Sequence, residues 1–159
     1  MVEDSDRTWL ARAVELSRAN MRAGKGGPFG AVIVRDGVVL AEGWNEVTSA
    51  LDPTAHAEVV AIRRACLAVE DFSLKGAAIY ASCEPCPMCL ASIYWARIER
   101  LVFANTREQA ASIGFDDEAI YREVSQPISD RAIPAVHLPT QDASDVFAEW
   151  ESRVDKIRY

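Results

Sequence analysis

The chain has 159 residues, half of them hydrophobic, which is enough for one domain with a buried core. Its 17 Lys and Arg residues against 24 Asp and Glu residues give a net charge of −7, which argues against a polynucleotide substrate because phosphate binding needs a basic surface. No apolar run reaches the length of a membrane span, and the acidic start shows no signal peptide. With four cysteines, the sequence therefore predicts a protein of the reducing cytoplasm.

The first predicted helix runs from a cap at Ser5 or Asp6 to about Ala23. A glycine-rich loop over 24–30 follows. Because this loop precedes a strand and does not follow one, the sequence excludes a phosphate-binding loop. Phe29 in this loop has two open roles, as core filler or as an apolar wall against a planar ring.

Two β-rich runs, 31–34 and 38–41, flank the dipeptide Asp36-Gly37, which predicts a β-hairpin. The second strand ends near Asn45. An asparagine at the end of a strand is usually a turn former, but its amide can also pair with the edge of a nucleobase. The sequence alone leaves both roles of Asn45 open.

A helix over about 55–69 is predicted to carry His56 and Glu58 in its first turn. Apolar residues repeat along it at helical spacing and are predicted to face the core: Val59, Ile62, Cys66 and Val69. Cys66 is then a small buried hydrophobic residue and not a metal ligand.

A strand over 77–82 leads into a second helix that begins near Cys86. Pro87 is favoured in the first turn of a helix, where its missing N–H costs nothing. Cys86 and Cys89, three residues apart, then project from one face, and the helix N-terminus favours the thiolate form that binds metals. A strand over 100–104 completes a βαβ unit with a parallel strand pair.

His56, Cys86 and Cys89 are ligands of the kinds that zinc takes, and three of them leave a fourth tetrahedral position for water. Such a water has a pKa of about 7, and Glu58 is predicted to carry its proton without ligating the metal. A redox-active cysteine pair would not need the upstream His56 and Glu58. A structural site would need a fourth ligand, for which Cys83 is the only nearby candidate.

The pattern weakens after Asn105. Three short elements are predicted there: a helix over 118–124, a last strand over 134–138 and a final helix over 144–156. On residue type alone, Asp116 and Asp117 are helix-capping residues and Tyr159 is a frayed terminus. Without linkers or repeats, residues 1–159 are predicted to form a single domain.

The chain resembles the cytidine-deaminase-like superfamily, and more narrowly the bacterial guanine deaminases of that fold. The resemblance covers nearly the whole chain and rests on these stretches: 27–34, 52–58, 82–89, 93–97, 114–117 and the terminal Tyr159. The H-x-E and P-C-x-x-C motifs alone are shared by many zinc deaminases. The chain departs from the guanine deaminase pattern at Ala91-Ser92, where Gly-Ala is expected, and at Ile157-Arg158, where a Lys-Glu ending is expected.

The resemblance implies a three-layer α/β/α sandwich with a five-stranded mixed sheet. It also implies Zn2+ held by His56, Cys86 and Cys89, Glu58 as proton shuttle and Asp117 as a second acid near the substrate. Further substrate contacts are implied for the following residues: Asn45, Phe29, Ala57, Trp95 and Tyr159. The family also implies a domain-swapped homodimer, in which a C-terminal segment crosses between subunits and Tyr159 closes the active site of the other subunit.

The reaction implied by the resemblance is hydrolytic deamination of guanine to xanthine and ammonia, a step of purine metabolism on a free base. Related enzymes act on guanosine, on cytosine-like bases and on triazines such as ammelide, so these stay open as substrates. A tRNA adenosine deaminase fits less well, because it needs a basic approach and an open site. A zinc-stabilised binding module without activity would leave Glu58 without a role.

Overall fold

The structure, a computed structural model, describes residues 4–159, so the first three residues of the acidic start lie outside the described residues. The chain divides into two compact units, Met1–Glu118 and Ala119–Tyr159, which are described separately. In the described part of the chain, no helix combines the length and apolar character that crossing a membrane requires.

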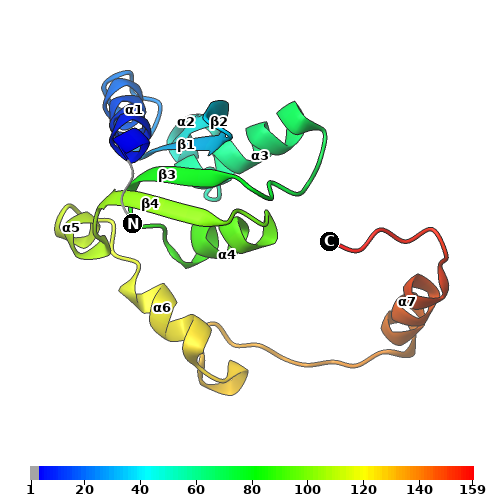
Figure 1. Cartoon of the computed structure of the whole chain (residues 1–159). Coiled ribbons are helices and arrows are strands. Elements are labelled where there is room, and N and C mark those ends of the chain that lie inside the picture. The colour runs from blue at the N-terminus through cyan, green and yellow to red at the C-terminus, as the bar shows by residue number, and fades with distance from the viewer. Residues whose placement is uncertain (1–3) are drawn as a thin grey trace. The chain divides into compact units, whose positions relative to one another are not determined.

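The first unit is an α/β unit built on one sheet (Figure 1). Its elements in chain order are α1 (Asp4–Arg22), β1 (Gly30–Arg35), β2 (Val38–Trp44), α2 (Val47–Ala50), α3 (Ala57–Val69), β3 (Ala78–Cys83), α4 (Pro87–Trp95), β4 (Arg100–Asn105) and α5 (Arg107–Ser112). The sheet order is β2-β1-β3-β4, with β3 and β4 parallel and the other pairs antiparallel. The predicted hairpin and βαβ unit are therefore confirmed, whereas the short helices α2 and α5 were not predicted.

The sheet has four strands within the described residues, so the prediction of five is wrong. Residues 134–138, predicted as the last strand, form no regular structure. Pro134 begins this segment and Pro139 follows it, and both lack the N–H that a sheet ladder needs. Val136 is 90% exposed and Leu138 80%, so neither of these apolar side chains is buried against a sheet.

Alternate side chains of β1 enter two separate cores, because successive residues of a strand point to opposite faces. Ala31 and Ile33 belong to the core that α3 and α4 cover. Val32 and Val34 belong to the core that includes residues of α1. Both helices that begin at the predicted metal motifs therefore pack against the same face of the sheet.

Close packing of α3 on the sheet depends on Gly43 in β2. A Cβ added to Gly43 would lie 2.2 Å from the carbonyl oxygen of Ala57, at the first turn of α3. Ala57, Ala61 and Ala65 are fully buried along this contact, and the predicted apolar positions Ile62, Cys66 and Val69 pack at its margin. Small residues therefore set the distance at which the start of α3 sits on the sheet.

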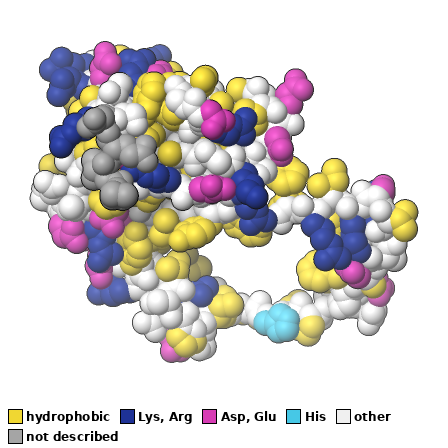
Figure 2. Space-filling view, viewed as in Figure 1, with side chains coloured by type: hydrophobic (Ala, Val, Ile, Leu, Met, Phe, Trp, Pro, Cys, Tyr) yellow, Lys and Arg dark blue, Asp and Glu magenta, His cyan; other side chains and the backbone are white. Residues whose placement is uncertain are grey.

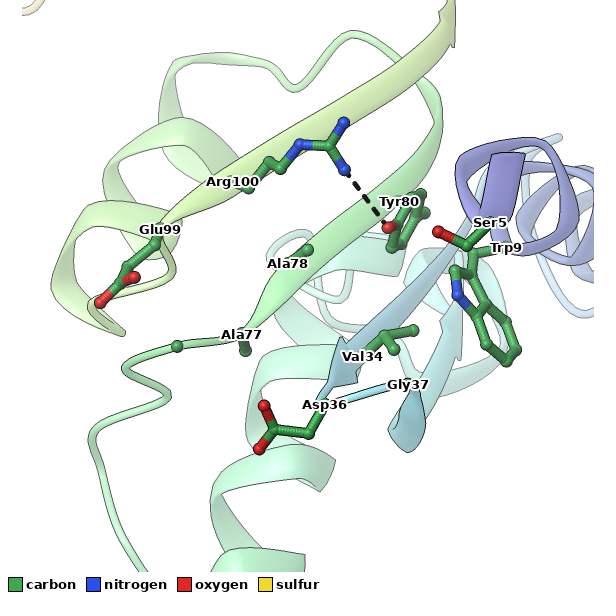
Figure 3. A pocket seen from close by; sticks show the side chains of 11 residues that line it. Ser5, Trp9, Val34, Asp36, Gly37, Ala77, Ala78, Tyr80, Glu99 and Arg100 are labelled. Atoms are coloured by element: carbon green, nitrogen blue, oxygen red, sulfur yellow. Dashed lines mark hydrogen bonds between the residues drawn. The ribbon is translucent and has the colours of Figure 1, made fainter. Parts of the chain in front are cut away.

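The prediction that Ser5 or Asp6 caps the first helix is wrong, because both residues lie within α1. Asp6 is only 2% exposed, and its carboxylate accepts hydrogen bonds from Arg100 Nη2 at 2.6 Å and from the Tyr80 hydroxyl at 3.0 Å. These partly buried contacts tie α1 to β3 and β4. A cavity of about 390 Å³ lies beside them, lined in part by Trp9, Tyr80 and Arg100 (Figure 3).

The second unit begins within α6 (Glu118–Ser125), close to the predicted helix over 118–124, and continues through η1 (Ile128–Asp130) to α7 (Gln141–Ser152). α7 begins earlier than predicted because the Thr140 hydroxyl accepts a hydrogen bond from the backbone N–H of Ala143. None of the residues in 119–159 is buried. Figure 2 shows hydrophobic side chains at the molecular surface, and in this unit they include Phe147, which is 80% exposed.

Candidate active site

The three predicted metal ligands lie at the starts of α3 and α4. His56 is the N-cap residue of α3, with an extended backbone (φ −70°, ψ 155°), so it directly precedes the helix and does not form part of its first turn. Cys86 is the N-cap residue of α4, and Pro87 occupies the first helical position, as predicted. Cys89 lies one turn into α4 and is fully buried.

The ligand atoms of His56, Cys86 and Cys89 all lie within 4.8 Å of one another. His56 Nδ1 is 3.6 Å from Cys86 Sγ and 3.5 Å from Cys89 Sγ. Zinc bonds of about 2.3 Å to sulfur and about 2.05 Å to nitrogen, at a tetrahedral angle, would separate nitrogen from sulfur by about 3.6 Å. The side chains therefore match tetrahedral zinc in ligand type and in spacing.

The electrostatics of this group favour a thiolate. The pKa of Cys86 is lowered to about 4, chiefly by a hydrogen bond from the Cys89 side chain and also by the His56 ring. The same contact with Cys86, followed by burial, raises the pKa of Cys89. The hydrogen bond to Cys86 raises the pKa of His56. At neutral pH the group thus already holds one negatively charged sulfur before any metal binds.

Glu58 lies in the first turn of α3 and is only 7% exposed. Burial is the main cause that raises the pKa of its carboxyl group, and the negative charge of Cys86 adds to it. The Glu58 side chain also hydrogen-bonds with Cys89, which places it beside the ligand group. A buried carboxyl group with a raised pKa is a stronger proton acceptor than an exposed one, as a general base requires.

Asn45 serves as a turn former and keeps a donor available. Its Oδ1 accepts hydrogen bonds from the backbone N–H groups of Gly27 at 3.1 Å and Val47 at 3.3 Å. These two donors fix the amide orientation, because only the oxygen can accept them. Among the described residues, Asn45 Nδ2 has no hydrogen-bond acceptor, although Asn45 is only 6% exposed. The amide can therefore donate to a bound molecule.

Phe29 forms an edge-to-face contact with Phe115, with ring centroids 4.9 Å apart and planes at 90°. Phe115 also lies close to Gly27, where an added Cβ would be 3.2 Å from its ring.

Asp117 follows Phe115 by two residues. Burial raises the pKa of Asp117, and the negative charge of Cys86 raises it further, so the two groups interact electrostatically.

Three other residues are predicted to contact the substrate: Ala57, Trp95 and Tyr159. Ala57 is fully buried in the sheet-facing core, so only its backbone can contact a substrate. Trp95 is the last residue of α4, and nine helical residues separate it from Cys86 by about 13 Å. Tyr159 belongs to the second unit, and its side chain is 71% exposed.

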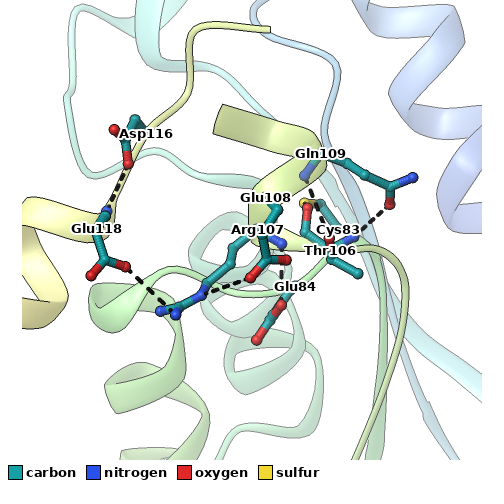
Figure 4. Close-up of polar contacts among 8 residues, drawn as sticks. All are labelled: Cys83, Glu84, Thr106, Arg107, Glu108, Gln109, Asp116 and Glu118. Carbon is teal, nitrogen blue, oxygen red and sulfur yellow. Dashed lines mark hydrogen bonds and ion pairs between the residues drawn. The ribbon is translucent and has the colours of Figure 1, made fainter. Parts of the chain in front are cut away.

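Residue types alone did not single out Glu84, Arg107 or Phe115, yet all three contact segments of the site (Figure 4 shows the first two). α5 carries a sequence signal that was missed. Thr106 and Gln109 form a capping box, in which each side chain bonds to the backbone of the other residue. The signature T-x-x-Q over 106–109 would have located this helix start.

Comparison with known proteins finds similarity to deaminases. Residues 3–105 match the family described as "Cytidine and deoxycytidylate deaminase zinc-binding region". The chain is 47% identical over 152 residues to the guanine deaminase of Bacillus subtilis (strain 168), an alignment that covers 96% of this chain and 97% of that protein. An X-ray structure of guanine deaminase from Bacillus subtilis superposes with a TM-score of 0.94 and covers 96% of this chain and 98% of that one.

More distant similarities reach other deaminases. The chain is 37% identical over 132 residues to the tRNA-specific adenosine deaminase of Agrobacterium fabrum, covering 80% of this chain and 84% of that protein. A crystal structure of the protein NE0047 in complex with 2,6-diaminopurine is 31% identical, with a TM-score of 0.69, and covers 74% of this chain and 65% of that one. The fold is therefore the α/β fold of the cytidine-deaminase-like proteins, and the chain belongs to the cytidine and deoxycytidylate deaminase zinc-binding family.

Proposed function

We propose that this protein is a hydrolase that deaminates guanine to xanthine and ammonia, with zinc held by His56, Cys86 and Cys89. The observation that carries the proposal is the buried carboxyl group of Glu58 beside a ligand trio with tetrahedral spacing. The 47% identity to a guanine deaminase over nearly the whole chain supports guanine as the base. The tRNA-specific adenosine deaminases are less similar, and a chain of net charge −7 is poorly suited to a polyanion.

When bound, zinc supplies a water molecule whose pKa is lowered to about 7. Attack by this water on the carbon that bears the exocyclic amine would release a proton, which Glu58 would take and pass to the ring nitrogen. The proton of the hydroxyl group left on that carbon would then pass through Glu58, assisted by Asp117, to the amino group, which would leave as ammonia. The pKa of each carboxyl group is raised, which makes each a stronger proton acceptor.

Binding of the base is assigned to groups around this centre. Asn45 donates from Nδ2 to an acceptor on the edge of the base, while its Oδ1 stays on the backbone. Phe29 packs against the ring, supported by Phe115. Because Ala57 buries its methyl group in the core, its contribution is a backbone contact.

The protein is further proposed to act as a domain-swapped homodimer, in which the C-terminal segment of one subunit closes the site of the other. The second unit buries none of its own apolar side chains, and such a segment gains stability by docking on a partner. Tyr159, at the end of this segment, serves as the closing residue. Trp95 is also exposed at 63% and is assigned to the shared site.

The proposal also covers the layer arrangement of the fold and the cellular compartment. The sheet is the middle of a three-layer α/β/α arrangement, which is supported by one core with α1 and another with α3 and α4 on opposite side chains of β1. The protein works in the reducing cytoplasm in purine metabolism. None of its four cysteines, all within the described residues, forms a disulfide, which fits that compartment.

Ammonia release from the zinc-loaded protein tests the proposed function directly. Guanine, guanosine, cytosine, adenine and ammelide are compared in parallel, and guanine is expected to react fastest. A different base reacting fastest would reject guanine but keep the roles of zinc and Glu58. Absence of ammonia release from every base would reject the enzyme.

A further inference from the structure

Asp117 lies on a loop and has no helix or strand of its own to hold it. The loop over 113–117 joins α5 to α6 and turns at Gly114, whose φ is +95°. Asp116 Oδ1 accepts a hydrogen bond from the backbone N–H of Glu118 at 2.9 Å, which shapes the end of the loop locally. A reacting carboxyl group on a loop needs contacts with rigid elements to keep its geometry.

One such contact runs through the backbone of Arg107. Its N–H donates to Glu84 Oε2 at 3.1 Å (Figure 4). The N–H of Glu84 in turn donates to the carbonyl oxygen of Asn105 at 2.8 Å. Glu84 stands two residues before the ligand Cys86. The start of α5 is therefore attached to the segment that carries the metal ligands.

The side chain of Arg107 reaches in the other direction. Its Nη2 lies 3.5 Å from Glu118 Oε2, and its Nε donates to Glu108 Oε1 at 3.4 Å (Figure 4). Glu118 directly follows Asp117. The charge of Arg107 also acts on Asp117, where it lowers the pKa against the larger opposing effect of burial.

We propose that Arg107 is a positioning residue, which joins the segment before Cys86 to the segment after Asp117 and so fixes Asp117 at the site. The inference rests on the proposed function, in which Asp117 assists proton transfer to the leaving group. The Arg107 side chain is 36% exposed and that of Glu118 52%, and ion pairs at such a surface contribute little to folding. The role of Arg107 should therefore appear in turnover more than in stability.

The test compares Arg107→Met with Arg12→Met as a matched control. Arg12 is 40% exposed and also pairs with two carboxylates, those of Glu15 and Glu42. It belongs to α1, which contributes to the core on the other face of the sheet. We expect Arg107→Met to lower kcat by about tenfold or more with KM changed less than about twofold, because misplacing a catalytic group weakens the transition state. Zinc content and Tm should match those of Arg12→Met.

Three further variants separate the ion pair between Arg107 and Glu118 from the charge of Arg107 itself. Glu118→Gln keeps the charge of Arg107 but weakens this ion pair, and it should also lower kcat. Arg107→Lys should restore part of the turnover. In an Asp117→Asn background, Arg107→Met should cause no further loss, because residues that act through one another are not additive. A full additional loss in that background, or a kcat equal to that of Arg12→Met, would overturn the inference.

Hydrogen–deuterium exchange of residues 113–118 gives a readout that needs no substrate. We expect faster exchange in Arg107→Met than in Arg12→Met, since the loop loses its attachment. Equal exchange in both variants would overturn the positioning role. If the wild-type protein deaminates no base, the proposed function fails, whereas the exchange comparison still decides whether Arg107 holds the loop.

Discussion

At the scale of single residues, the site combines one group that must stay charged with another that must change its charge. Cys86 sits at the start of a helix beside His56, and its pKa of about 4 keeps the thiolate at neutral pH. Glu58 is enclosed by the core, and burial raises its pKa. Two acidic groups on adjacent helices are thus driven in opposite directions by their surroundings, which suits one to bind metal and the other to carry protons.

Replacing Glu58 with Gln should abolish turnover while keeping zinc. The amide fills the same buried space but cannot take up the proton, so we expect a loss of about 10²–10⁴-fold or more in kcat. The measurement is ammonia release alongside zinc content by metal analysis. Turnover near that of the wild type would remove Glu58 from the proposed mechanism.

Replacing Asn45 with Asp should separate the two roles of this side chain. The carboxylate can still accept from the N–H groups of Gly27 and Val47, but it has no donor for the base. We expect the folded, zinc-binding protein with kcat/KM reduced by about tenfold or more, since an acceptor on the bound base is left unpaired. Asn45→Ala, the comparison variant, should also lower Tm. Unchanged kcat/KM in Asn45→Asp would mean that Asn45 only shapes the turn.

At the scale of elements, the sequence best predicts the helices and turns that are determined by residues close together in the chain. The Pro87 helix start and the hairpin are local patterns, and both form as predicted. Asp6 was misassigned as a cap because its partner Arg100 is 94 residues away. The strand over 134–138 was wrong because strand propensity cannot form a sheet without a neighbouring strand.

The loop over 113–117 makes a second contact with the site through Phe115, which the sequence did not reveal. Replacing Phe115 with Ala removes its edge-to-face contact with Phe29, worth about 0.5–1.5 kcal/mol in such pairs. We therefore expect KM for guanine to rise by about two- to tenfold, because Phe29 loses its support. Ile113→Ala on the same loop, where Ile113 is 61% exposed, is the control and should leave KM unchanged. Equal KM values for the two variants would show that Phe29 does not depend on Phe115.

At the scale of the whole molecule, the two units differ in whether they bury their apolar side chains. The first unit buries apolar side chains on both faces of its sheet, whereas the second buries none. Periodicity along the chain predicts that α7 has an apolar face, but it carries no information on which surface covers that face. For the same reason the sequence could not derive the role of Tyr159 from its own neighbours, and only the family resemblance indicated it.

Complementation between two inactive variants tests whether the C-terminal segment acts on the partner subunit. One variant carries Glu58→Gln, and the other lacks residues 157–159, which should reduce turnover while leaving zinc and folding intact. In a mixed swapped dimer, the truncated chain supplies Glu58 and the other chain supplies Tyr159 to the same site. Random pairing would then restore about a quarter of the wild-type sites, since half of the dimers are mixed and each has one complete site.

If the segment closes the site of its own subunit, no mixed dimer contains a complete site, and co-expression restores nothing. The control is co-expression of Glu58→Gln with a chain that carries both Glu58→Gln and the truncation, because that pair has no intact Glu58 under either arrangement. Full turnover of the truncated chain alone would mean instead that the three terminal residues take no part in the reaction. Recovery near one quarter, with none in the control, is the outcome that the swapped arrangement requires, because only a segment exchanged between subunits can join these two residues in one site.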